Sequence, residues 1–155
     1  MDNNEVLRSL RKVLAANETT MAEILGKAKQ SSDPLTMKNM LKHNNEADFH
    51  RCDDNTLAEF LEALIEYKRG STAQPTQPVF AYRLTNNQIL KKLRVAFELK
   101  DTDMFSLFAE GGQEIQKQEL KSLFRNEEHK NFKPCDDKLL RVFLTGLAQR
   151  TRSAS

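Results

Sequence analysis

The chain has 155 residues, 30% of them charged, and its 24 Lys and Arg nearly balance 22 Asp and Glu to leave a net charge of +2. This balance excludes a strong general attraction to nucleic acid or anionic lipid, so a charged partner must be recognised by a local patch. No apolar run approaches the roughly 18 residues of a membrane span, and the first residues lack a signal peptide pattern, so we expect a cytoplasmic protein with no membrane partner and with reduced cysteines.

Two stretches of the chain repeat each other without a gap at a constant offset of 83 residues, from Asn3 to Leu64 and from Asn86 to Leu147. Apolar residues inside each stretch recur with a period near 3.6, which favours helices. We therefore predict an all-α fold, a tandem duplication of a roughly 70-residue four-helix unit with pseudo-two-fold symmetry. We expect residues 1–70 to form the first repeat, 71–85 a linker partly packed on the body, 86–150 the second repeat and 151–155 a frayed tail.

The first helix of each repeat should begin directly after an asparagine pair, whose second members are Asn4 and Asn87. An asparagine side chain at that place can cap the free amides of the first turn. The second helix should open at Thr20, which stands three residues before Glu23 in the spacing of a capping box. In the second repeat only the cap of this box should remain, at Asp103.

The third helix should begin at Pro34 with Asp33 as its cap, because proline lacks only an amide hydrogen that has no helical partner in the first turn. The fourth helix of each repeat follows a Cys-Asp-Asp motif. Its residues are Cys52 and Cys135, Asp53 and Asp136, and Asp54 and Asp137, preceded by Phe49 and Phe132. We expect the first aspartate to cap the helix, the second to face the positive end of the helix dipole, and the phenylalanine to form a hydrophobic staple.

Free cysteine is among the residue types most often buried, so we predict that Cys52 and Cys135 are small core residues beneath the staple. The alternative of a reactive thiol at a helix amino terminus is opposed by the adjacent aspartates, whose negative charge raises a thiol pKa. A metal site is not favoured either, because His43, His50 and His129 do not recur at equivalent positions. No phosphate loop or nucleophile elbow is present, so we expect no catalytic residue, no cofactor and no enzyme activity.

Four stretches carry a resemblance to a known family. The patterns "NNxxLxxLR" and "FxxCDDxxLxxFLxxLI" and the segments "RLTNNQILKKLR" and "EEHKNFKPCDD" are similar to those of the YehS-like family of bacterial proteins, known as domain of unknown function 1456. The resemblance covers nearly the whole chain. It implies a bacterial cytosolic origin and the two-copy architecture, and it supplies no activity, cofactor or catalytic residue.

Some positions outside the apolar stripes are basic in both copies. Lys38 and Lys42 stand one turn apart on the expected third helix, and Lys121 and Arg125 occupy the same places in the second repeat. We expect each pair to be exposed together on its helix, where it could contact a nucleic acid groove or backbone.

Arg11 and Arg94 differ from these residues because they lie beside the apolar stripe of the first helix. We expect each to be a partly buried guanidinium paired with an aspartate of its own half, in preference to a ligand-binding role. The sequence as a whole favours a non-catalytic module whose two similar surfaces engage a protein partner. The alternative is DNA or RNA binding by the third helices, and the third hypothesis is a thiol- or metal-dependent activity at the Cys-Asp-Asp motifs.

Overall fold

A computed structural model describes residues 1–27, 33–70 and 83–153 of the chain, and every regular element in these ranges is a helix. The helices of the first repeat are α1 (Asn3–Leu14), α2 (Glu18–Gly26), α3 (Pro34–Met40) and α4 (Asp54–Arg69). Those of the second repeat are α5 (Asn86–Ala96), α6 (Asp101–Glu110), α7 (Lys117–Leu123) and α8 (Asp137–Ser153). Each helix of the second set begins 83 residues after its counterpart, so the predicted all-α duplication is confirmed.

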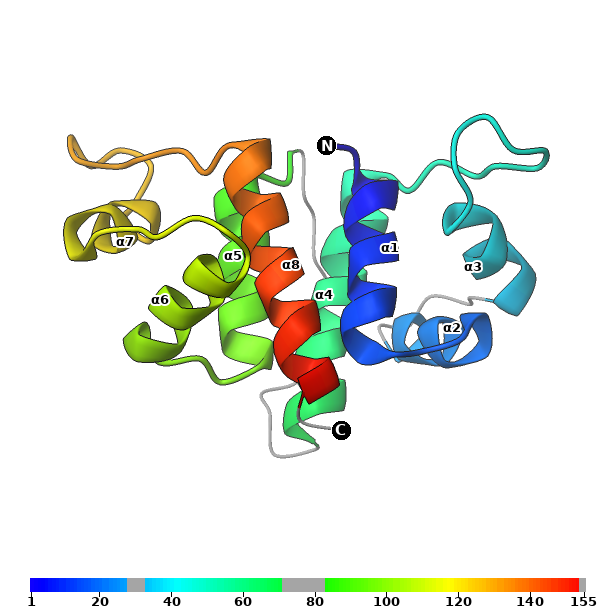
Figure 1. The fold of residues 1–155 in the computed structure, drawn as a ribbon. Helices are drawn as coiled ribbons and strands as arrows, with labels where there is room; N and C mark the ends of the chain where they lie inside the picture. Colours follow the sequence, from blue (N-terminus) through cyan, green and yellow to red (C-terminus); the bar gives the residue numbers. More distant parts are fainter. Residues whose placement is uncertain (28–32, 71–82, 154–155) are drawn as a thin grey trace.

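The long helices α1, α4, α5 and α8 form the centre of the molecule, with α2 and α3 at one side and α6 and α7 at the other (Figure 1). Helices of one repeat pack on helices of the other. Helix α1 packs most extensively on α8, and α5 packs most extensively on α4. Because these two interfaces are equivalent under the offset, the repeats are related by a pseudo-two-fold axis and share one core.

The core contains the apolar stripes that the helical period predicted. Phe60 of α4 and Phe143 of α8 are both fully buried, and Phe108 of α6 packs against Phe143 with a ring-centroid distance of 5.5 Å. Complete burial of a large apolar side chain contributes about 1.5–3 kcal/mol to stability. The stripes therefore provide the main force that holds α6 on α8.

The predicted caps of the third and fourth helices are confirmed. Asp33 accepts a hydrogen bond from the amide of Thr36, and Asp53 accepts one from Thr56, each at 2.7 Å. Asp136 likewise accepts from the amide of Leu139 at 2.7 Å. The first aspartate of each Cys-Asp-Asp motif thus satisfies an amide that the helix itself leaves free.

The predicted start of the first helices is wrong. Helix α1 begins at Asn3, and its cap is Asp2, which accepts from the amide of Glu5 at 2.8 Å. Thr85 caps α5 in the same way, with Gln88 completing a capping box. Both asparagines of each pair therefore lie inside the first turn, where their side chains are free to bond elsewhere.

The capping box expected at the second helix is also wrong. Helix α2 begins two residues before Thr20, and Asn17 is its cap, accepting from the Thr20 amide at 2.8 Å. In α6, Asp103 accepts from the amide of Lys100 at 2.8 Å, so it lies in the third helical position and bonds back to the start of the helix. Thr20 and Asp103, the expected caps, therefore both occupy the third helical position.

The predicted linker and the predicted tail each lie partly outside the described residues. The apolar part of the linker, at Val79, Phe80 and Tyr82, lies outside the described residues. Leu84, at the end of the linker, is half-buried against the core. The frayed tail was predicted to start at residue 151, whereas α8 continues as a helix to Ser153.

Candidate binding site

The second asparagine of each pair holds the segment that joins the third helix to the fourth. Asn4 is 1% exposed, and its Nδ2 donates to the carbonyls of Met40 at 2.8 Å and His50 at 2.9 Å. Its Oδ1 accepts from the amide of Cys52 at 3.0 Å. Asn87 makes the same three contacts, to Leu123 and Lys133 at 2.9 Å and to Cys135 at 2.8 Å.

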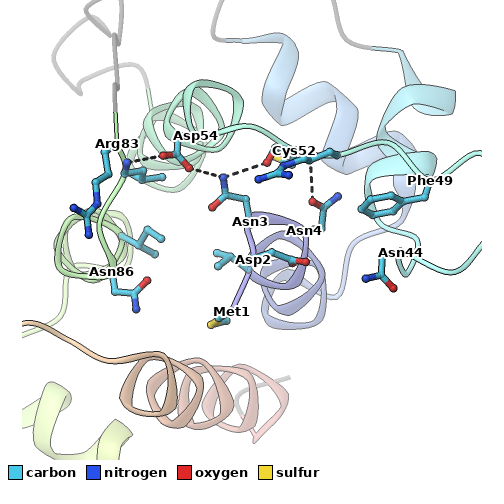
Figure 2. A pocket seen from close by; sticks show the side chains of 14 residues that line it. Met1, Asp2, Asn3, Asn4, Asn44, Phe49, Cys52, Asp54, Arg83 and Asn86 are labelled. Carbon is cyan, nitrogen blue, oxygen red and sulfur yellow. Dashed lines mark hydrogen bonds between the residues drawn. The ribbon is translucent and has the colours of Figure 1, made fainter.

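The first asparagine of each pair reaches the second aspartate of the motif. Asn3 Nδ2 donates to the carbonyl of Cys52 at 3.1 Å and to Asp54 Oδ1 at 2.7 Å, so it lies between these groups in Figure 2. Asn86 repeats both contacts, to Cys135 at 3.0 Å and to Asp137 at 2.8 Å. We call the bonds from each asparagine pair to the end of the third helix, the segment after it and the Cys-Asp-Asp motif the clasp.

The second aspartates also join the two repeats. The remaining oxygen of Asp54 accepts from the amide of Leu84 at 2.9 Å, which Figure 2 shows as a bond across to the segment before α5. The remaining oxygen of Asp137 accepts from the amino group of Met1 at 2.5 Å. Met1 and Leu84 are equivalent under the offset, so the two contacts are reciprocal.

This position has an electrostatic consequence for the second repeat. The bond from the Met1 amino group, followed by the bond from Asn86, holds the pKa of Asp137 below its ordinary value. The sequence predicted only a helix-dipole role for the second aspartates. In the structure they also connect one repeat to the other.

The cysteines lie inside the clasp and are core residues, as predicted. Cys52 is 2% exposed and Cys135 is 5% exposed. Burial, and after it the charge of the adjacent aspartates, raises the pKa of each thiol to about 12. Only a very small fraction of either thiol is ionised near neutral pH, and the thiolate is the reactive form.

A hollow borders each clasp. The first has a volume of about 560 Å³ and is lined by Phe49 and Cys52, and the second has a volume of about 480 Å³ and is lined by Phe132 and Cys135. Phe49 and Phe132 are half-buried, and their packing as staples stays a prediction. Asn3, Asn4 and Asn86 in these walls are already bonded within a clasp.

The arginines beside the apolar stripe each close the turn that follows their helix. Arg11 Nε donates to the carbonyl of Ala16 at 3.2 Å, and Arg94 Nε donates to the carbonyl of Leu99 at 3.0 Å. Arg94 pairs with Asp101 at 2.6 Å, as predicted. The prediction of an aspartate is wrong for Arg11, whose partner is Glu18 at 3.8 Å.

A groove beside α7 brings together several of the basic residues singled out in the sequence. It has a volume of about 330 Å³, and we call it the basic groove. Its lining consists of Arg94, Asp101, Lys117, Leu120, Lys121, Phe124 and Arg125. Four cations face one carboxylate, so the groove has an excess of three positive charges.

The groove also has an apolar component. Phe124 lies under the guanidinium of Arg94, with 4.9 Å from the guanidinium carbon to the ring centroid. Such a contact holds the cation in place while leaving it charged. Leu120 contributes a second apolar side chain to the lining. The groove can therefore contact a ligand that carries both negative charge and apolar surface.

The predicted arrangement of the basic pairs on the third helices is wrong in part. Lys38 and Lys121 are exposed in the last turns of α3 and α7, but both helices end before Lys42 and Arg125. Lys42 Nζ donates to the carbonyl of Ala47 at 2.9 Å. Helices of seven residues, each followed by a turn, cannot present the two basic positions as one exposed helical face.

The two repeats differ at this site. Lys117 is replaced by Pro34 in the first repeat, and Phe124 is replaced by Leu41. Sequence reasoning missed Lys117 and Phe124 because it considered only positions that are basic in both copies. The available signal was the opposite one, a gain of charge and of an aromatic ring in one copy alone.

Other site classes find no support in the described ranges. No group of three histidine, cysteine or acidic side chains within them is arranged to hold a metal ion. None of their helices combines the length and the apolar character needed to cross a bilayer.

Comparisons with known proteins agree with the duplication. The family described as "Protein of unknown function (DUF1456)" matches residues 3–70 and again residues 86–153. "Uncharacterized protein YehS" of Escherichia coli (strain K12) is 37% identical over 150 residues, which cover 97% of this chain and 96% of that protein. No solved structure matches the chain. The chain therefore belongs to the DUF1456 family and contains the family's domain twice.

Proposed function

We propose that this protein is a non-catalytic binding protein that takes up an acidic segment of a partner protein in the basic groove. The observation that carries the proposal is the composition of the groove, four cations and one carboxylate around Phe124 and Leu120. Charge attracts an acidic segment and sets its orientation, while apolar contacts favour a segment that also carries apolar side chains.

The clasps support this function indirectly. The clasp of the second repeat fixes the segment between α7 and α8 and thereby the backbone on either side of Arg125. A site whose walls are already ordered loses less conformational entropy when a ligand binds. The buried thiols and the asparagines of the clasps serve the scaffold and leave recognition to the groove.

A second candidate function is nucleic acid binding, and the presence of Lys121, Arg125 and Arg94 in one groove favours it. Against it, the first repeat has Pro34 in place of Lys117, and its Lys42 is bonded to the Ala47 carbonyl, so the two halves do not offer duplex DNA two equivalent contact surfaces. We therefore place it behind protein binding.

The test is fluorescence anisotropy with a short labelled peptide of alternating glutamate and leucine, compared with labelled duplex and single-stranded oligonucleotides. Lys121→Gln/Arg125→Gln should weaken peptide binding, because it removes two of the four groove cations. The matched control is Lys38→Gln/Lys42→Gln, which changes the equivalent positions of the first repeat and should leave binding unchanged.

Three outcomes are decisive. Absence of peptide binding at low salt, or equal weakening by the two double variants, would refute the function. Tighter binding of an oligonucleotide than of the peptide, with a salt slope near −0.9 per phosphate contact, would establish the nucleic acid candidate instead.

A further inference from the structure

The cations of the basic groove differ in how far they are already neutralised. Arg94 is paired with Asp101 at 2.6 Å and stacked on Phe124. Lys117 and Lys121 are exposed and have no ion-pair partner in the described part of the chain. After the pairing of Arg94 with Asp101, the uncompensated charge therefore resides on Lys117, Lys121 and Arg125.

Arg125 has donors that the protein does not satisfy. Its Nε is buried and has no hydrogen-bond partner among the residues that the structure describes. Its Nη1 lies 2.9 Å from His129 Nε2, while His129 Nδ1 lies 3.0 Å from the amide of Asn131. A neutral imidazole has a single acceptor nitrogen, so it cannot accept from both Arg125 and Asn131.

The contacts from Arg125 and Asn131 compete for the one acceptor nitrogen of His129. If His129 accepts from the Asn131 amide, its Nε2 carries a hydrogen that points at a hydrogen of Arg125. An acceptor oxygen from a ligand in the groove could then replace His129 as the partner of Arg125 Nη1, whereas Nε is buried. Nη1 is therefore the Arg125 donor that an anion in the groove would contact.

The first repeat lacks each of these features. The equivalent of Arg125 is Lys42, whose amino group is bonded to the Ala47 carbonyl. The equivalent of His129 is Glu46, a negative charge, which accepts from the amide of His43 at 3.0 Å. The anion-accepting arrangement belongs to the second repeat alone, so general helix geometry does not account for it.

We infer that the anion bound in the basic groove is a phosphate monoester, carried on a phosphorylated side chain of the acidic partner segment. This inference rests on the proposed function of the groove and names the group that it recognises. A phosphate monoester carries close to two negative charges at neutral pH and three acceptor oxygens. It can neutralise two of the three uncompensated cations and bond to Arg125, whereas a carboxylate has one charge and two oxygens.

The experiment compares three labelled peptides of the same glutamate and leucine sequence, which differ at one central position carrying phosphoserine, glutamate or serine. The phosphoserine peptide should bind roughly tenfold more tightly than the glutamate peptide, the gain expected from one additional charge-assisted hydrogen bond. Arg125→Gln should abolish this advantage. Lys42→Gln, the matched change in the first repeat, should preserve it, and unchanged thermal melting should show that both variants are folded.

The outcomes separate this inference from the function on which it rests. Equal binding of the phosphoserine and glutamate peptides, both weakened by Lys121→Gln/Arg125→Gln, would overturn the phosphate inference and leave the acidic-segment function standing. Binding of none of the peptides would overturn both. Displacement of the phosphoserine peptide by inorganic phosphate at an equal concentration would also overturn it, because the groove would then be a site for the free anion.

Discussion

Replacing Asn4 with alanine tests whether the clasp is structural, because Asn4 is the buried polar side chain at its centre. The substitution removes the hydrogen bonds to the carbonyls of Met40 and His50 and from the amide of Cys52. A buried polar group that loses its partner costs about 1–3 kcal/mol. The bonds to Met40 and Cys52 are buried and the bond to His50 is partly buried, so the low end of that range predicts that Asn4→Ala lowers the free energy of unfolding by about 2–3 kcal/mol.

The second repeat provides the control for this prediction. Asn87 makes the same three bonds, but its bond to the Lys133 carbonyl is exposed and its bonds to Leu123 and Cys135 are only partly buried. Water can replace partners that it can reach, so Asn87→Ala should cost roughly half as much, about 1.5 kcal/mol. The difference between the variants follows from burial alone, because the hydrogen bonds are otherwise the same.

The assay is chemical denaturation of the wild type and both variants, followed by far-ultraviolet circular dichroism. The slopes against denaturant must agree before the free energies are compared. An Asn4→Ala cost below about 1 kcal/mol, or a larger cost for Asn87→Ala, would refute the reasoning.

Three further predictions concern the core and the motif. Gly146→Ala should lower the free energy of unfolding by about 1–3 kcal/mol in the same assay, because the added Cβ would lie 2.0 Å from the Leu107 carbonyl oxygen. A stabilised variant would contradict the close packing of α6 on α8. Cys52 and Cys135 should react slowly with a thiol reagent in the native state and fast in denaturant, because a pKa of about 12 leaves almost no thiolate in the folded protein. Rapid labelling of the native protein would contradict this account. Because the pKa of Asp137 is lower in the folded than in the unfolded state, its carboxylate should stabilise the fold at pH values above the ordinary aspartate pKa of about 3.9. That contribution should be lost as the pH falls through the folded pKa. Asp137→Asn should therefore be less stable than the wild type at neutral pH, with a gap that narrows in acid, and a gap independent of pH would exclude this linkage.

The sequence predicted the parts of the fold that depend on local spacing. The offset of 83 residues located all four helices of the second repeat once the first was known, because an ungapped duplication preserves element lengths. Asp33 and Asp53 were correctly identified as caps, since each stands directly before a clear helical pattern. Burial of Cys52 followed from residue type alone.

The errors arose where the partner of a side chain is distant in sequence. Asn3 and Asn4 have the chemistry of helix caps, and nothing local indicates that they bond instead to a segment more than thirty residues away. The contact between Asp54 and Leu84 depends on how the repeats pack, which no pattern within one repeat contains. Lys42 was misplaced because the period of α3 does not reveal that the helix ends at Met40.

The basic groove could be predicted only in part. Lys121 and Arg125 were proposed as ligand contacts because they are basic in both copies, whereas Arg94 was assigned a structural ion pair, so two of the four groove cations were predicted as contacts. Lys117 and Phe124 were missed because their counterparts, Pro34 and Leu41, do not share their chemistry. A site that exists in one copy is indicated by differences between the repeats, and not by the positions that they share.

The most direct test of the central claim is a map of the ligand site by amide NMR spectra of the isotopically labelled protein, titrated with the phosphoserine peptide. The duplication supplies an internal reference, because residues 11–18 and 34–42 are the counterparts of 94–101 and 117–125. The account predicts that the signals of 94–101 and 117–125 shift with one common affinity while those of their counterparts stay unchanged. Equal shifts in both repeats, or shifts confined to other parts of the molecule, would contradict recognition by the basic groove.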